Sequence, residues 1–184
     1  DTGETTVLAV DDEPALREMY AMFLEDTYEV IIAESGETAL SAMDEGIDVV
    51  LLDRRMPRMS GGEVLEELRD RGYDVPVMMV TAVDPKEDIV EMPFDDYLVK
   101  PIDREQLHAK VDVLASQANL DAKSREFYRL ASKRATLETQ ESFDHTASEE
   151  YQELVDRMET LRSEIDETLD GLFEEEPRAA VQSI

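Results

Sequence analysis

The chain has 184 residues and a mass of 20.9 kDa, which suits one domain with an appendage rather than two full domains. Its 46 acidic residues against 18 basic ones give a formal charge of −28, and 42% of its residues are apolar, enough to form a core. Such a charge repels itself unless salt screens it, so the composition indicates a halophilic host. It also disfavours binding to nucleic acid or to anionic membranes.

Cysteine and histidine usage restricts the redox and metal chemistry. The chain has no cysteine, which excludes disulfides and thiolate sites, and its two histidines are His108 and His145. A metal site would therefore use oxygen ligands. No apolar run approaches the roughly 18 residues needed to span a bilayer, and the first residues lack the features of a signal peptide, so we predict a cytoplasmic protein.

The first 118 residues alternate between short strand-like runs and helical segments. The strand-like runs are Thr6–Val10, Tyr28–Ala33, Asp48–Leu52, Val75–Val80 and Tyr97–Val99. Helical spacing lies between them, for example at Leu16, Met19, Tyr20, Phe23 and Leu24. Strands that are apolar on both faces and separated by helices predict an α/β fold with a parallel sheet covered on both sides. In such sheets, functional residues gather beyond the carboxyl ends of the strands.

The composition changes after about Ser116, where strand-like runs and glycine give way to helix formers. One helix is predicted from Asp121 to Thr139, and a second from Thr146, where Thr146-x-x-Glu149 has the form of a capping box. Apolar residues of the second helix recur at every third or fourth position, namely Tyr151, Leu154, Met158, Leu161, Ile165, Leu169 and Leu172. This spacing predicts a helical hairpin or a coiled-coil seam, with packing onto the preceding sheet as the alternative.

Polar residues stand at the ends of four of the predicted strands: Asp11 and Asp12, Asp53, Thr81, and Lys100. Three of these residues have an ordinary alternative role. Asp12 could cap a helix that begins at Pro14, Asp53 could be a solvated loop acid, and Thr81 could simply end a strand. Because the carboxyl ends of parallel strands meet at one edge, we predict that these residues form one site.

Such a site is suited to phosphoryl chemistry. Three crowded carboxylates raise one another's pKa unless a cation joins them, and oxygen ligands favour Mg²⁺, which also accepts a phosphate oxygen. A central carboxylate can attack phosphorus and form an acyl phosphate, while Mg²⁺ and a lysine neutralise the transferring oxygens. Asp53 is the carboxylate of the central strand, and the Thr81 hydroxyl can bond a phosphoryl oxygen.

Four motifs follow one another in the chain, namely Asp11-Asp12, Asp53-Arg-Arg-Met-Pro57, Thr81-Ala82 and Tyr97-Leu-Val-Lys100-Pro101. In order and spacing they resemble the receiver domains of two-component response regulators, over about Thr5–Ala118. The resemblance implies a flavodoxin-like, doubly wound five-stranded parallel sheet of order 2-1-3-4-5. It also implies a sensor histidine kinase as partner. Such a protein is a phosphoacceptor rather than an enzyme in the usual sense, although it catalyses its own phosphotransfer and dephosphorylation.

The resemblance also implies roles for individual residues. Asp53 would accept the phosphoryl group and, with Asp12, bind Mg²⁺, which Asp11 would assist through water. The backbone carbonyl of Arg55 would supply a further ligand, and Lys100 would contact the phosphoryl group.

Two more features follow from the resemblance. Thr81 and Tyr97 would form a switch pair, in which the hydroxyl moves toward the phosphoryl group and the ring turns into the vacated space. A cis peptide is expected at Lys100-Pro101.

The chain departs from the family pattern in two places. The stretch Asp84–Pro93 is short and has a proline near each end, so its helix would span barely two turns and the usual dimerisation face would be altered. Arg54 and Arg55 place two cations beside an anionic site. They either pair with surface acids or, in the case of Arg55, modulate the access of water to the acyl phosphate.

The tail resembles the helical HalX domain of haloarchaeal regulators over about Leu120–Phe173. From Leu120 onward it has 17 acidic and 8 basic residues, a net charge of −9, and no basic recognition helix. Its first helix has a basic stripe, namely Lys123, Arg125, Arg129, Lys133 and Arg134. We interpret the stripe as forming salt bridges to the acidic second helix, with a nucleic-acid surface as the alternative.

These observations predict a receiver domain over residues 1–118 and a HalX-like output domain over residues 119–184. We interpret the protein as a phosphorylation-controlled switch whose tail binds a protein partner or a second copy of the chain. A DNA-binding transcriptional regulator is the alternative function. A phosphohydrolase is disfavoured because Arg55 stands where such enzymes place a general acid.

Overall fold

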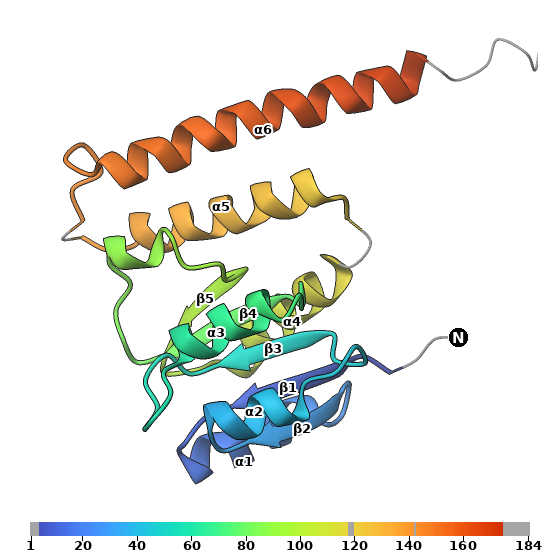
Figure 1. Ribbon diagram of the computed structural model, residues 1–184, viewed down its shortest axis with the longest axis vertical. Coiled ribbons are helices and arrows are strands. Elements are labelled where there is room, and N and C mark those ends of the chain that lie inside the picture. The colour runs from blue at the N-terminus through green and yellow to red at the C-terminus, as the bar shows by residue number, and fades with distance from the viewer. Residues whose placement is uncertain (1–3, 118–119, 142, 175–184) are drawn as a thin grey trace, which may run out of the picture.

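The computed structural model describes residues 4–117, 120–141 and 143–174. Its five parallel strands form one sheet in the order β2-β1-β3-β4-β5, which confirms the predicted topology (Figure 1). The strands are β1 (Thr6–Val10), β2 (Glu29–Ala33), β3 (Val49–Leu52), β4 (Val77–Thr81) and β5 (Asp96–Val99). The helices are α1 (Pro14–Leu24), α2 (Gly36–Ala42), α3 (Gly61–Asp70), α4 (Arg104–Ser116), α5 (Ala122–Glu138) and α6 (Glu149–Glu174).

Four strands of the sheet, β1, β3, β4 and β5, are buried on both faces, and their successive side chains point to opposite sides. In β1, Leu8 and Val10 pack in a core with α2 and α3, whereas Val7 and Ala9 pack in a second core with α1 and α4. All four side chains are almost fully buried. The strands therefore have apolar residues at consecutive positions, as a parallel sheet between two helical layers requires.

Two predicted features of the helices are wrong. The stretch between β4 and β5 has only a 3₁₀ turn, η1 (Glu87–Ile89), because the nearby prolines leave no room for two helical turns. The cap of α6 is Ser148 rather than Thr146: the Ser148 hydroxyl accepts a hydrogen bond from the Tyr151 amide at 3.1 Å. Thr146 instead bonds Asp144.

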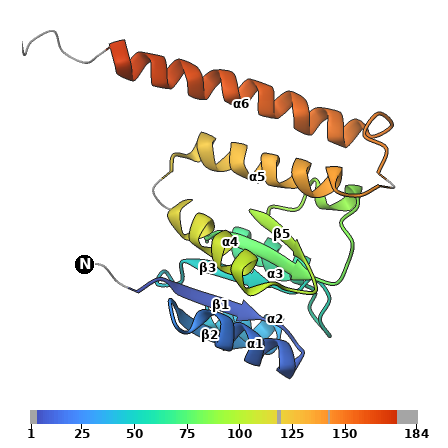
Figure 2. The same ribbon diagram turned by 180° about the vertical axis from the view of Figure 1, so that it is seen from behind.

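The C-terminal helices form a hairpin, and its first helix packs against the sheet. In Figures 1 and 2, α5 lies beside the edge strand β5 and α6 lies on the outside of α5. Leu137 of α5 and Tyr151 of α6 join the core cluster of α2 and α3. An edge strand exposes unpaired backbone groups, and α5 covers that edge. The predicted domain boundary, after residue 118, lies outside the described residues.

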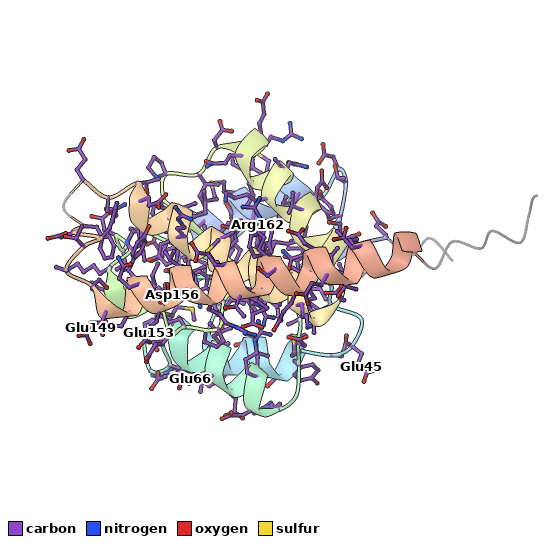
Figure 3. All side chains as sticks on the ribbon, turned by 90° about the horizontal axis from the view of Figure 1, so that it is seen from above. Glu45, Glu66, Glu149, Glu153, Asp156 and Arg162 are labelled. Atoms are coloured by element: carbon purple, nitrogen blue, oxygen red, sulfur yellow. The ribbon has the colours of Figure 1, made fainter. Side chains whose placement is uncertain are left out.

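Acidic side chains cover the outer surface of the hairpin. Glu149, Glu153 and Asp156 lie along the exposed side of α6 (Figure 3). Within the described part of the chain, no helix has both the length and the apolar character needed to cross a membrane.

Lys133 is an unusual member of α5 because its side chain is buried among receiver-side residues. It is 5% exposed, its Nζ donates to the Val90 carbonyl oxygen at 2.9 Å, and it lies 5.1 Å from the centre of the Phe94 ring. Burial, together with the nearby Arg129 charge, lowers the pKa of Lys133 from 10.5 to about 8.

The lowered pKa predicts that the protein becomes more stable in mildly alkaline solution. Near pH 9.5 the folded protein has released this proton and the unfolded chain still holds it, so stability rises with pH. Between pH 7 and pH 9.5 the free energy of unfolding should increase by about 2 kcal/mol. Urea unfolding of the wild type and of Lys133→Met checks this, and an equal rise in both proteins would contradict it.

Candidate functional site

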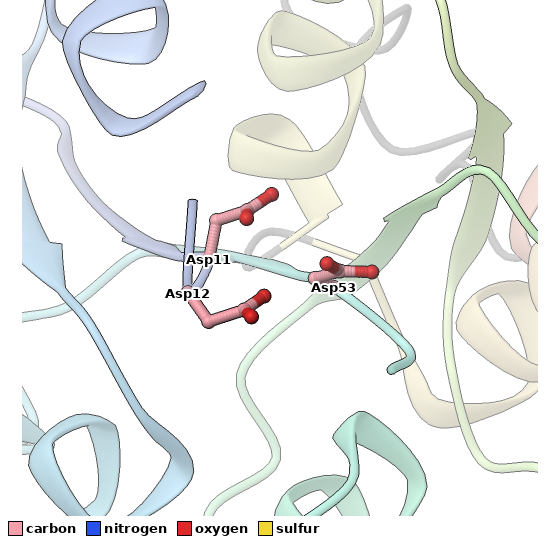
Figure 4. Close-up of side chains that lie close together, drawn as sticks. All are labelled: Asp11, Asp12 and Asp53. Atoms are coloured by element: carbon pink, nitrogen blue, oxygen red, sulfur yellow. The ribbon is translucent and has the colours of Figure 1, made fainter. Parts of the chain in front are cut away.

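Three carboxylates lie together at the carboxyl edge of the sheet. Asp11 and Asp12 follow β1, and Asp53 follows the neighbouring strand β3 (Figure 4). One oxygen of each carboxylate lies within 4.8 Å of the others. The alternative capping role of Asp12 is not observed, since the cap residue of α1 is Glu13 and makes no side-chain capping bond.

Lys100 supplies the positive charge of this cluster. It follows β5, and its Nζ donates to Asp11 Oδ2 at 2.9 Å and contacts Asp53 Oδ2 at 3.5 Å. The expected cis peptide at Lys100-Pro101 is present. The sheet therefore brings Asp11, which follows the first strand, into direct contact with Lys100, which follows the last.

The surroundings of Asp53 disfavour an isolated negative charge. Burial raises the pKa of Asp53 above its ordinary value. The positive charge of Lys100 lowers this pKa, and the negative charge of Asp11 raises it further. Burial by itself would lower the pKa of Lys100, but its bond to Asp11 and the charge of Asp53 raise it. Three oxygen ligands at this spacing, with excess negative charge, fit a hard divalent cation such as Mg²⁺.

Two of the three carboxylates, those of Asp12 and Asp53, line a cavity of about 460 Å³, and Asp11 is buried behind them. Its walls include predicted site residues, namely Asp12, Asp53, Arg55, Thr81 and Lys100. They also include Asp84 and Lys86, which the sequence reasoning missed as site residues. Their place just beyond the carboxyl end of β4 was the available signal, but both fell in a stretch predicted to be helical.

The predicted switch residues both contact Val83. The Val83 amide donates to Thr81 Oγ1 at 3.2 Å, and the Tyr97 hydroxyl donates to the Val83 carbonyl oxygen at 2.7 Å. The Tyr97 ring is buried against Phe94, with the two ring centres 5.6 Å apart. The segment after β4 is therefore tied to both residues.

The two arginines that follow Asp53 have different surroundings. Arg54 forms an ion pair with Asp88 in η1, as the surface-pairing alternative predicted. Arg55 lines the cavity, and its backbone amide lies 3.3 Å from Asp53 Oδ1. Arg54 is therefore bound to η1, whereas Arg55 lines the cavity that contains Asp53.

The chain matches the models of two known families. The model of the response regulator receiver domain matches residues 7–112, and the model of the HalX domain matches residues 105–181. The chain belongs to the response regulator receiver family. Its five parallel strands in the order 2-1-3-4-5 have the receiver topology, and a HalX region follows them.

Relatives of the receiver come from archaea and bacteria. A Haloferax volcanii protein is 41% identical over 88% of this chain and 28% of its own length. Sensory transduction protein RegX3 of Mycobacterium tuberculosis is 41% identical over 58% of this chain and 49% of its own. The transcriptional regulatory protein PhoP of Bacillus subtilis, for alkaline phosphatase synthesis, is 35% identical over 65% and 52%. The chain thus spans about half the length of the two bacterial proteins and 28% of the length of the Haloferax volcanii protein.

Solved receiver structures have the same fold. Chemotaxis protein CheY4 of Vibrio cholerae is 32% identical, with a TM-score of 0.58 over 61% of this chain and 99% of that one. Response regulator TrrA of Thermotoga maritima, solved in complex with Mg²⁺-BeF, is 36% identical, with a TM-score of 0.54 over 60% and 98%.

The basic stripe of α5 mostly faces the receiver, contrary to the prediction that it pairs with the second tail helix. Arg125 and Arg129 bind Asp74, and Arg129 also binds the buried Asp95. Lys123 pairs with Glu164 of α6 at 3.5 Å, and Arg134 pairs with Glu138 of its own helix. Receiver acids more than 30 residues away in sequence therefore bind Arg125 and Arg129.

Proposed function

We propose that the protein is a response regulator that accepts a phosphoryl group on Asp53 from a sensor histidine kinase. The observation that supports this proposal is the position of the Asp53 carboxylate, which lines a cavity with Asp12 and Lys100 and lies close to the buried Asp11. An Asp53 oxygen attacks phosphorus, the bond from phosphorus to the donor's imidazole nitrogen breaks, and an aspartyl phosphate forms. Residues 1–118 would form the phosphoacceptor domain, and residues 119–184 the output domain.

Each residue of the site has a proposed task. Asp12, Asp53 and the backbone carbonyl of Arg55 would hold Mg²⁺, with Asp11 assisting through water, and bound Mg²⁺ would neutralise charge on the transferring oxygens. Lys100 would bond a phosphoryl oxygen. Its present contact with Asp11, at 2.9 Å, keeps the ammonium at the site before the phosphoryl group arrives.

The response would begin at Thr81 and Tyr97. The Thr81 hydroxyl would donate to a phosphoryl oxygen, and Tyr97 would follow it. Both residues form a hydrogen bond with Val83, so a movement of Thr81 would also displace the residue that accepts the bond from the Tyr97 hydroxyl. The tail would pass the state to a protein partner or a second copy of the chain.

Phosphorylation with a small donor tests this function. The protein, incubated with Mg²⁺ and acetyl phosphate in molar KCl, should gain about 80 Da, the mass of one phosphoryl group, at Asp53. Addition of EDTA should prevent the gain. Light scattering on the same samples reports self-association. A protein that binds Mg²⁺ and gains no mass would contradict the proposal.

A further inference from the structure

α5 is held against the receiver by buried polar contacts, which we call the clasp. The clasp comprises Arg129, Ser132 and Lys133 of α5 and, on the receiver, the Val90 carbonyl, Asp95 and Asp96. Arg129 Nε donates to Asp95 Oδ1 at 2.6 Å, Ser132 Oγ donates to Asp96 Oδ1 at 2.7 Å, and Lys133 Nζ donates to the Val90 oxygen at 2.9 Å. α5 thus covers the β5 edge beside the short turn η1.

Breaking only some of the contacts of the clasp is energetically unfavourable. Asp95 is fully buried and Asp96 is 3% exposed, and Asp95 also binds Arg69 at 3.1 Å. A buried charge that loses a partner pays a large desolvation penalty. A displacement of α5 that breaks only some of these contacts is therefore unfavourable, because it leaves Asp95 or Asp96 buried with fewer partners.

One segment connects the phosphoacceptor site with the clasp. Residues 83–94 run from the cavity wall to the strand β5. At the site end, Arg54, which follows Asp53, pairs with Asp88, and the Tyr97 hydroxyl bonds Val83 at 2.7 Å. At the other end, Lys133 bonds Val90 and lies over Phe94, whose ring packs on Tyr97.

The same segment presents charges to the cavity. Asp84 and Lys86 both line it, together with Asp53. A phosphoryl group adds negative charge and three acceptor oxygens, so it repels Asp84 and attracts Lys86. Because the two forces act in opposite directions on residues of one short segment, we expect them to turn it, and Val90 lies four residues beyond Lys86.

We propose that residues 83–94 transmit phosphorylation of Asp53 to α5 by withdrawing the Val90 carbonyl from Lys133, which loosens the clasp. In this protein, a helix of the C-terminal region thereby takes the place of a receiver helix as the responding element. The inference rests on the proposed function, because it needs a phosphoryl group at Asp53. It specifies where the response leaves the receiver.

Hydrogen exchange on the full chain tests the inference. The wild type is compared with and without Mg²⁺ and acetyl phosphate, and intact mass is read from the same samples. Amides of α5 should exchange about fivefold faster in the phosphorylated protein, while those of α3 keep their rate. Phosphate on Asp53 with unchanged exchange in α5 would overturn the inference alone. No gain of mass would overturn the proposed function, and the inference with it.

Variants of two neighbouring residues, Lys133 and Arg134, test which contact couples phosphorylation to α5. Lys133→Met keeps an apolar side chain over Phe94 but cannot donate to Val90, so α5 should respond to phosphorylation by less than about twofold. Arg134→Ala is the matched control, because Arg134 is exposed and pairs with Glu138 of its own helix. It should respond as the wild type does. An undiminished response in Lys133→Met would overturn the role of Lys133, and the wild-type comparison decides the inference even if that variant fails to fold.

Discussion

The Asp53→Asn variant should gain no phosphoryl mass from acetyl phosphate, a loss of at least about a thousandfold in rate. The amide is nearly isosteric with the carboxylate but has no anionic oxygen to attack phosphorus. The substitution should not unfold the protein. Because burial and Asp11 raise the pKa of Asp53, its charge is disfavoured in the fold, and a neutral amide should resist urea at least as well at pH 7.

The matched control for this variant lies at the other end of the same strand. Asp48 precedes β3 as Asp53 follows it, and its carboxylate accepts the Thr6 amide at 2.8 Å, a bond that an asparagine oxygen can keep. Asp48→Asn should be phosphorylated like the wild type. Intact mass and peptide mapping measure both variants. Phosphate retained on Asp53→Asn would show that another residue accepts the phosphoryl group.

Gly61→Ala should damage the site through packing alone. Gly61 is the first residue of α3, and its amide donates to the Arg54 carbonyl at 2.8 Å. A Cβ at this position would lie 2.2 Å from the Asp53 carbonyl oxygen and 2.9 Å from Arg54 Cα. Both are backbone atoms and cannot rotate away, so the phosphoacceptor loop must move.

We expect Gly61→Ala to lower the free energy of unfolding by about 3 kcal/mol. It should also slow phosphorylation by at least about tenfold, because displacement of a reacting group is costly. Gly62→Ala is the control one residue away, since its Cβ would meet nothing nearer than Met92 Cε at 3.6 Å. Because Gly62 lies within α3, Gly62→Ala should raise the free energy of unfolding by about 0.5–1 kcal/mol. Equal urea midpoints for the two variants would contradict the close approach.

The sequence by itself determined the sheet and the composition of the site. Strands that are apolar at consecutive positions, such as Val49–Leu52, are stable only between two covering layers, and the carboxyl ends of parallel strands meet at one edge. These two rules bring Asp11, Asp12, Asp53 and Lys100 together before any coordinates are known. The motif spacing then indicated the receiver family, which the family match confirmed.

Only the tertiary structure decided what the tail helix contacts. The apolar and basic positions of α5 show that the helix has a buried side, but periodicity does not name the partner of that side. Arg129 and Lys133 lie more than 30 residues from Asp95 and Val90 in sequence. Their pairing requires that α5 can pack against β5, and the short turn η1 leaves space for α5 there. Local patterns set which side chains are buried, whereas the choice among distant oppositely charged partners is made by the shape of the assembled sheet.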